Sequence, residues 1–285
     1  MGKVIYVSDP ERFSFRHINP WNICADLSKY RELITSMTIQ NFRSTYQASY
    51  LGIAWQVVLP LIMLSIFYFV FGVILGGRFA PIANESRLDY ALALFVGLGV
   101  FNFIAQNIGA APSVILANAT YVKSLAFPLE VLPIITVLTS YITLLINIGI
   151  TIVVFFLAKG MIHPSAIFTV FYLLCILLVT LGISWIFSML SVFFRDISAF
   201  VSPLTIILMF MCPIFYPASM VPKRIKWVIE ANPIASIIEN IRACLLYGVW
   251  PSISSIIFVF TFSLLFAITG YCLFMYSKSA FADFM

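Results

Sequence analysis

The chain has 285 residues, of which 62% are hydrophobic and only 9% charged, and its mean hydropathy is +1.06. A water-soluble domain carries roughly 25% charged residues, so this composition excludes a soluble globular protein. The apolar runs are continuous and about 20 residues long, which favours membrane-spanning helices over a β-barrel. The net charge of +5 comes mostly from loops and span ends. It therefore indicates contact with membrane lipid headgroups and no nucleic-acid partner.

The first part of the chain, residues 1–55, is expected to be a cytoplasmic segment that contains one amphipathic helix over 26–47. The apolar residues of this helix recur at helical spacing on one side: Leu27, Tyr30, Leu33, Ile34 and Met37. Such a helix can lie in the membrane interface or pack on a soluble partner. A membrane span is predicted shortly after this helix, and this favours a position of the helix in the membrane interface.

The remaining residues, 56–285, are expected to form an all-α, polytopic transmembrane domain. About six spans are predicted, over residues 57–75, 90–111, 131–158, 166–194, 197–215 and 253–277. The charges before the first span favour a cytoplasmic N-terminus, and an even number of spans returns the C-terminus to the same side. The stretch 216–252 is too polar to span and too apolar for a solvated loop. It predicts short helices on the outer side that dip into the membrane against protein or a water-filled cavity.

No pattern of catalytic residues is present, and no metal site is indicated. The two histidines, His17 and His163, lie in loops, and the sequence has neither a G-x-S-x-G nor an H-E-x-x-H motif. The predicted spans hold no carboxylates, which argues against the two alternatives considered, an intramembrane enzyme and an ion-coupled secondary transporter. A phosphate-binding G-x-x-x-x-G-K-[ST] loop is also missing. We therefore expect a non-enzymatic protein without a cofactor of its own, driven by another chain.

Several segments, in chain order, resemble the signatures of ABC-2 type permeases that export polysaccharides. They are YQASYLGIAWQVVLP at 46–60, FVGL at 95–98, NATYVKSLAFPLEVLP at 118–133, FRDI at 194–197, PIFYPASMVP at 213–222 and NPIASIIENIRACLLYG at 232–248. Each piece alone is weak, but the ordered series covers about residues 26–250. The residues that carry the resemblance are Tyr46, Gly52, Trp55, Arg195, Asp196, Asn232, Pro233 and Arg242.

The resemblance implies a homodimer that binds two copies of a separate ABC ATPase, which holds ATP and Mg²⁺. Together they would move lipid-linked polysaccharide across the bacterial inner membrane, with both termini of this chain cytoplasmic. It also implies an N-terminal interface helix and short helices that gate the outer side before the last span. A cytoplasmic coupling helix is implied within 112–130, with the contact residues Asn118, Tyr121, Lys123, Ser124 and Phe127. O-antigen is the favoured cargo because of the long N-terminal region; capsule, teichoic acid and small-drug export remain alternatives.

A transport path without charged residues has to hold a hydrated polymer by other means. Aromatic faces pack against the C–H faces of sugar rings without binding them tightly. We predict that two subunits line the path with aromatic residues of the first and fifth spans: Trp55, Phe67, Tyr68, Phe71, Phe210, Phe215 and Tyr216. For any one of these rings, packing on lipid or on another helix is the alternative interpretation.

Overall fold

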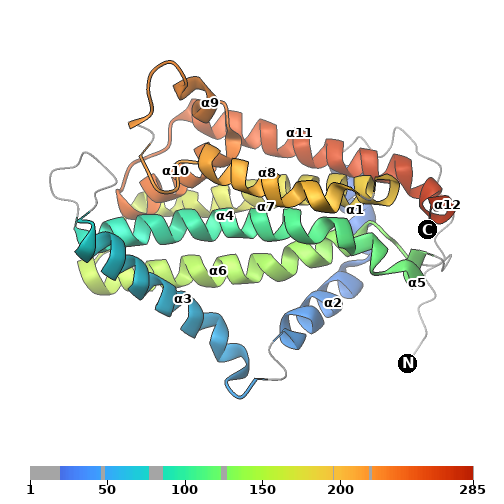
Figure 1. The fold of residues 1–285 in the computed structure, drawn as a ribbon, viewed down its shortest axis with the longest axis horizontal. Helices are drawn as coiled ribbons and strands as arrows, with labels where there is room; N and C mark the ends of the chain where they lie inside the picture. Colours follow the sequence, from blue (N-terminus) through green and yellow to red (C-terminus); the bar gives the residue numbers. More distant parts are fainter. Residues whose placement is uncertain are drawn as a thin grey trace.

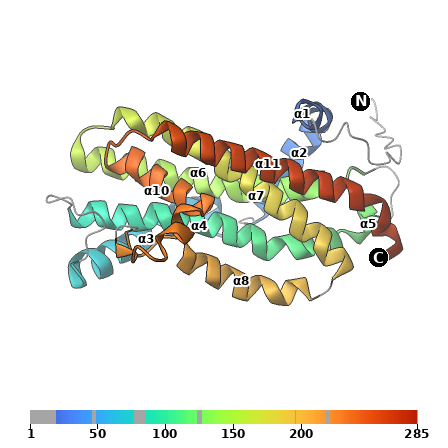
Figure 2. The same cartoon turned by 90° about the horizontal axis from the view of Figure 1, so that it is seen from above.

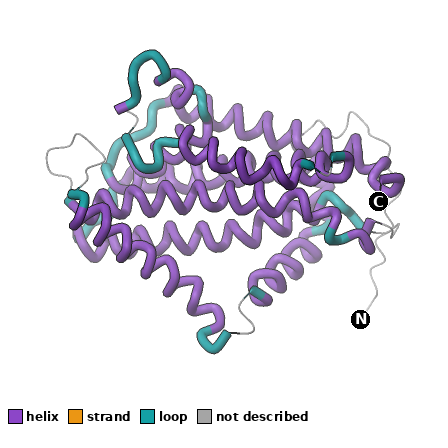
Figure 3. The backbone as a smooth tube through the Cα atoms, viewed as in Figure 1, coloured by secondary structure: helices purple, strands orange, loops and turns teal. Residues whose placement is uncertain are grey.

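The structure is a computed structural model that describes residues 20–45, 49–76, 86–122, 127–194, 196–217 and 220–284. Helix makes up nearly all of this backbone, and these ranges contain no strand (Figure 3). The long helices lie roughly side by side along the longest axis of the molecule (Figure 1). The expected all-α fold is therefore confirmed.

Five helical stretches are long and apolar enough to cross a membrane, which makes the chain a multi-pass membrane protein. The first is α3 (Trp55–Phe67), which continues into the π-helical turns η3 (Tyr68–Ile74). The others are α4 (Arg87–Leu116), α6 (Val131–Lys159), α7 (Ile167–Phe193) and α11 (Ile253–Ser277). A short turn, η4 (Pro164–Ala166), precedes α7, and η6 (Lys278–Ala280) follows α11.

The sixth apolar helix, α8 (Ile197–Met211), is shorter than the predicted span 197–215. Its 15 residues give a length of about 22 Å at 1.5 Å per residue, whereas the hydrocarbon core is about 30 Å thick. The helix ends because Cys212 precedes Pro213, and a residue before proline is driven out of the helical region. Cys212 accordingly has extended dihedral angles, φ −99° and ψ 137°.

The second span is longer than predicted at both ends. Ser86 and Asp89 form a reciprocal capping box, in which each side chain accepts a hydrogen bond from the other residue's backbone N–H, so α4 begins at Arg87. At its other end α4 continues through Pro112 to Leu116. The expected connection 112–130 therefore begins inside the helix.

The N-terminal region forms two helices where one was predicted over 26–47. They are α1 (Pro20–Lys29) and α2 (Arg31–Ser44), with Tyr30 between them. The predicted apolar side of α2 is half-buried, Thr38 beside it is buried, and α2 packs against α6. At least part of the apolar side thus contacts the protein's own bundle and not lipid. The division of the chain near residue 55 stays a prediction.

The two ends of the bundle differ in the short helices that they carry. At the α5 end lie α1, the short α5 (Ala119–Val122) and α12 (Phe281–Phe284); at the α10 end lie α9 (Lys226–Glu230) and α10 (Pro233–Leu246) (Figure 1). Within the described ranges, one ion pair joins different helices at each end. Lys159 bonds Asp89 at 2.8 Å at the α10 end, and Lys278 bonds Glu130 at 2.6 Å at the α5 end.

The interior of the bundle consists of two apolar clusters. The larger one is built around α4, the most buried span, with parts of α6, α7 and α10. The smaller one lies at the α5 end and joins α1, α4, α6, α7, α11 and α12. Helices α7 and α11 approach closely because glycines face each other: a Cβ on Gly270 would lie 2.6 Å from the carbonyl oxygen of Gly182.

Candidate functional site

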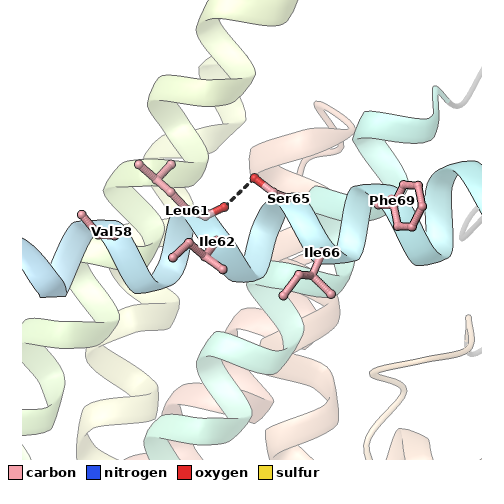
Figure 4. A pocket seen from close by; sticks show the side chains of 6 residues that line it. All are labelled: Val58, Leu61, Ile62, Ser65, Ile66 and Phe69. Atoms are coloured by element: carbon pink, nitrogen blue, oxygen red, sulfur yellow. Dashed lines mark hydrogen bonds between the residues drawn. The ribbon is translucent and has the colours of Figure 1, made fainter.

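Helix α3 diverges from the other spans and is largely uncovered (Figure 1). One of its faces lines a shallow hollow of about 460 Å³, shown in Figure 4. The lining side chains recur at the spacing of a single helix face: Val58, Leu61, Ile62, Ser65, Ile66 and Phe69. The hydroxyl of Ser65 donates to the Leu61 carbonyl at 2.8 Å. The hollow therefore offers an almost wholly apolar surface.

The aromatic residues predicted to line a path along the first span lie on different sides of it. Phe67 and Phe71 pack against the large cluster, and Phe71 meets Tyr90 of α4 edge-on at 6.4 Å between ring centroids. Tyr68 is exposed. Trp55 is half-buried, and its indole N–H donates to the Ser49 hydroxyl at 2.7 Å.

Helix α8 lies along one edge of the bundle and leaves one side uncovered (Figure 2). The exposed large residues of α8 are Phe200, Ile206, Ile207 and Phe210, and Phe215 follows them in the turn beyond the helix. Tyr216 is half-buried and its hydroxyl donates to the Phe210 carbonyl at 2.7 Å. Burial raises the pKa of the Tyr216 hydroxyl above its usual value.

Three of the predicted coupling residues, Asn118, Tyr121 and Phe127, lie at the α5 end. After α4, the Asn118 side chain caps the helix by donating to the Val114 carbonyl at 2.8 Å, and the single turn α5 follows. Tyr121 of this turn is exposed and stacks on Phe127, with ring centroids 4.4 Å apart. Lys123 and Ser124 lie outside the described residues.

At the opposite end, Asn232 and Pro233 begin α10. The Asn232 carboxamide oxygen accepts from the backbone N–H groups of Ile234 and Ala235, and Pro233 occupies the first helical position, where no N–H is needed. The Asn232 amide group donates to the carbonyl of Met211, the last residue of α8. One side chain thus starts α10 and ties it to α8.

Arg242 of α10 is a fully enclosed cation, with only 2% of its surface exposed. Its Nε donates to the carbonyl of Ala93 at 2.6 Å, Nη1 to that of Pro213 at 2.6 Å and Nη2 to that of Ile214 at 3.0 Å. The planar guanidinium suits this role because its donors point in fixed, divergent directions. Gly97 makes room for the guanidinium: a Cβ there would overlap Nη2 and lie 2.6 Å from Cζ.

Two further hydrogen bonds fix α10 to its other neighbours. The Ser165 hydroxyl, from the turn before α7, donates to the Cys244 carbonyl at 2.7 Å, and the Asn240 amide donates to the Ser255 hydroxyl of α11 at 3.0 Å. Arg242 and Asn232 add the bonds to α4 and to the end of α8. Four elements therefore hold α10 at this end of the bundle.

The sequence motifs are only partly brought together. Arg242 bonds the turn after α8 and Asn232 bonds the last residue of α8, next to Pro233 at the first position of α10. Gly52 and Asp196 stand at the starts of the helical stretches of α3 and α8. Tyr46 and Arg195 lie outside the described residues. Sequence reasoning missed the α3 hollow because that helix is apolar on every side. Gly97 lies in one of the matched motifs, but the sequence predicted no role for it because its neighbour in space, Arg242, is far away in the chain.

The arrangement offers apolar surfaces and hydrogen bonds between helices, and the described residues hold no group of three metal-ligating side chains.

The ABC-2 type transporter family matches residues 32–246. The chain is 31% identical over 257 residues to an O-antigen export system permease protein RfbA of Klebsiella pneumoniae, an alignment that covers 89% of this chain and 95% of that protein. A protein of the same name from Myxococcus xanthus is 24% identical over 226 residues, covering 76% of this chain and 82% of its own length. The chain belongs to the ABC-2 type transporter family.

Proposed function

We propose that this chain is the membrane subunit of an ATP-driven exporter that moves lipid-linked polysaccharide, with O-antigen favoured, across the bacterial inner membrane. The observation that carries the proposal is the similarity to O-antigen export permeases over 89% of the chain. The α5 end would face the cytoplasm with both termini, and the α10 end would face outward. ATP and Mg²⁺ would be bound by a separate ABC ATPase, present in two copies.

A second copy of this chain would cover the uncovered faces of α3 and α8. Helix α3 has only 11% of its span buried, and its hollow is lined almost entirely by apolar groups. Lipid could cover such a face, but a helix that diverges from its own bundle makes few contacts that hold it in place (Figure 1). Packing against a symmetric partner would supply those contacts.

The polysaccharide path would run between the two copies. Among the aromatic residues predicted to line it, Tyr68, Phe210 and Phe215 are exposed and free to face a polymer. Phe67 and Phe71 would support the path from behind, because they pack on the protein's own interior. Trp55 and Tyr216 would stand near the two mouths, where each already makes a hydrogen bond.

The coupling contact with the ATPase would be made by the segment from Asn118 to Phe127, including Lys123 and Ser124. The exposed ring of Tyr121, stacked on the half-buried Phe127, supports this assignment, because aromatic rings beside polar groups suit a protein contact. A cysteine at Tyr121 should crosslink to the ATPase subunit. Labelling of that cysteine from the outer side of intact cells would contradict both the contact and the orientation.

The experiment that tests the function joins the purified chain to its ATPase partner in proteoliposomes. The chain alone should hydrolyse no ATP, and the complex should hydrolyse ATP and move glycan, whose identity mass spectrometry of the transported material would establish. Capsular or teichoic glycan in place of O-antigen would correct the cargo. Robust ATP hydrolysis by this chain alone would contradict the proposal.

The path is tested by a triple alanine variant at Tyr68, Phe210 and Phe215 with a matched control. The control replaces three exposed aromatic residues of α6 and α11: Phe156, Phe260 and Tyr276. The first variant should lose surface polysaccharide while still assembling with the ATPase, whereas the control should export normally. Equal export by the two variants would show that the polymer touches other residues.

A further inference from the structure

Among the residues that the structure describes, the two ion pairs that join different helices form a natural comparison, because they have the same chemistry at opposite ends. In each, a carboxylate at the start of one helix meets a lysine at the end of another: Asp89 with Lys159, and Glu130 with Lys278. Each charge also suits the dipole of the helix end on which it sits. Both carboxylates are largely enclosed, with 10% of the Asp89 and 7% of the Glu130 side chain exposed.

The pair at the α5 end differs in where it lies in the chain. Glu130 is the residue before α6 and closes the segment that follows α5. Its carboxylate accepts from the Lys278 ammonium at the end of α11, and its backbone carbonyl accepts from the Trp185 indole N–H of α7 at 3.1 Å. A single residue thus connects this segment to three membrane spans.

An apolar contact runs parallel to these polar ones. Tyr121 stacks on Phe127, and Phe127 packs against the smaller apolar cluster. That cluster contains Leu132 of α6, Trp185 of α7 and Phe274 of α11, the same three helices that Glu130 joins. A displacement of the α5 turn would therefore be transmitted to a close-packed apolar core.

We propose that the Glu130–Lys278 ion pair is a positioning element that passes movement of the ATPase-contacting segment to α11, the last span. This inference rests on the proposed function. Without the ion pair, α6 and α11 would remain in the membrane, but the segment would act on α11 through the apolar contact alone. The pair at the α10 end, Asp89–Lys159, lies far from the ATPase and would contribute only to folding.

The test compares neutral variants of the two pairs in the assembled complex. Glu130→Gln and Lys278→Met should lower the amount of glycan exported per ATP hydrolysed by about fivefold or more, a usual size for coupling between sites. The double variant should be no worse than either single one, because the two residues act as a unit. Lys278→Arg, which keeps the charge, should restore most of the ratio. Asp89→Asn and Lys159→Met should leave the ratio at the wild-type value.

The outcomes separate the inference from the function on which it rests. A wild-type complex that moves no glycan with ATP would overturn the proposed function and this inference together. Normal export per ATP in the Glu130→Gln complex, with an active wild type, would overturn the inference alone. An equal loss in the Asp89→Asn complex would also overturn it, since the effect would then be one of general stability. If Glu130→Gln fails to assemble, Lys278→Met and Lys278→Arg carry the same comparison.

Discussion

Replacing Arg242 is the substitution for which the structure predicts the largest effect. Its guanidinium is enclosed and donates to the carbonyls of Ala93, Pro213 and Ile214. These carbonyls belong to α4 and to the turn after α8, so the side chain joins two elements to α10. In Arg242→Ala the three acceptors lose the guanidinium donors in a place that water does not reach.

The magnitude follows from the two carbonyls that lose their partner. The Ala93 carbonyl keeps the helical bond from the Gly97 N–H inside α4, whereas the carbonyls of Pro213 and Ile214 lie in the turn after α8. A buried polar group left without a partner costs about 1–3 kcal/mol, so two of them cost about 2–6 kcal/mol. Each 1 kcal/mol lowers the midpoint of thermal unfolding by about 2–4 °C in a protein of this size class, so a fall of at least about 4 °C is expected. Arg242→Lys should be intermediate, because one ammonium cannot reach acceptors that lie in divergent directions.

The assay is the temperature at which half of the detergent-solubilised protein survives as a monodisperse peak. Arg224→Ala is the matched control, because Arg224 is exposed. It should shift the midpoint by no more than about 1 °C, as is typical of surface changes. Equal midpoints for Arg242→Ala and Arg224→Ala would refute the argument that the three carbonyl bonds hold this end of the bundle together.

Three further substitutions are measured by the same assay. Gly97→Ala should destabilise strongly, because the new Cβ would overlap the buried guanidinium, whereas Gly109→Ala on the same helix meets open space and should be neutral or stabilising. Gly270→Ala should separate α7 from α11 and lower the midpoint, and Gly149→Ala, which also meets open space, is its control; equal midpoints would contradict the close approach. Asn232→Ala should cost about 0.5–2 kcal/mol by removing the cap of α10. An unchanged midpoint would mean that the cap is replaced by other groups.

Where apolar runs are bounded by local signals, the sequence alone was sufficient. The predicted spans 131–158 and 253–277 correspond to α6 (Val131–Lys159) and α11 (Ile253–Ser277). A run of this length has to be helical in lipid, because no water satisfies its backbone. The ends of α4 and α8 were predicted less accurately. A capping box extends the first of these helices, and the second stops where the residue before Pro213 becomes extended.

The tertiary structure alone decided which side of each apolar helix faces the interior. In water the apolar stripe of a helix marks its buried face. A span in lipid is apolar all round, so its sequence pattern does not show which side faces the interior of the protein. The sequence could therefore not separate Phe71, which packs inward, from Tyr68, which is exposed. Nor could it pair Gly97 with Arg242, because that contact depends on how α10 folds back against α4. Local sequence determined where the helices of this protein lie in the chain. Packing between residues far apart in the chain determined which helix faces are exposed and which contacts hold the helices together.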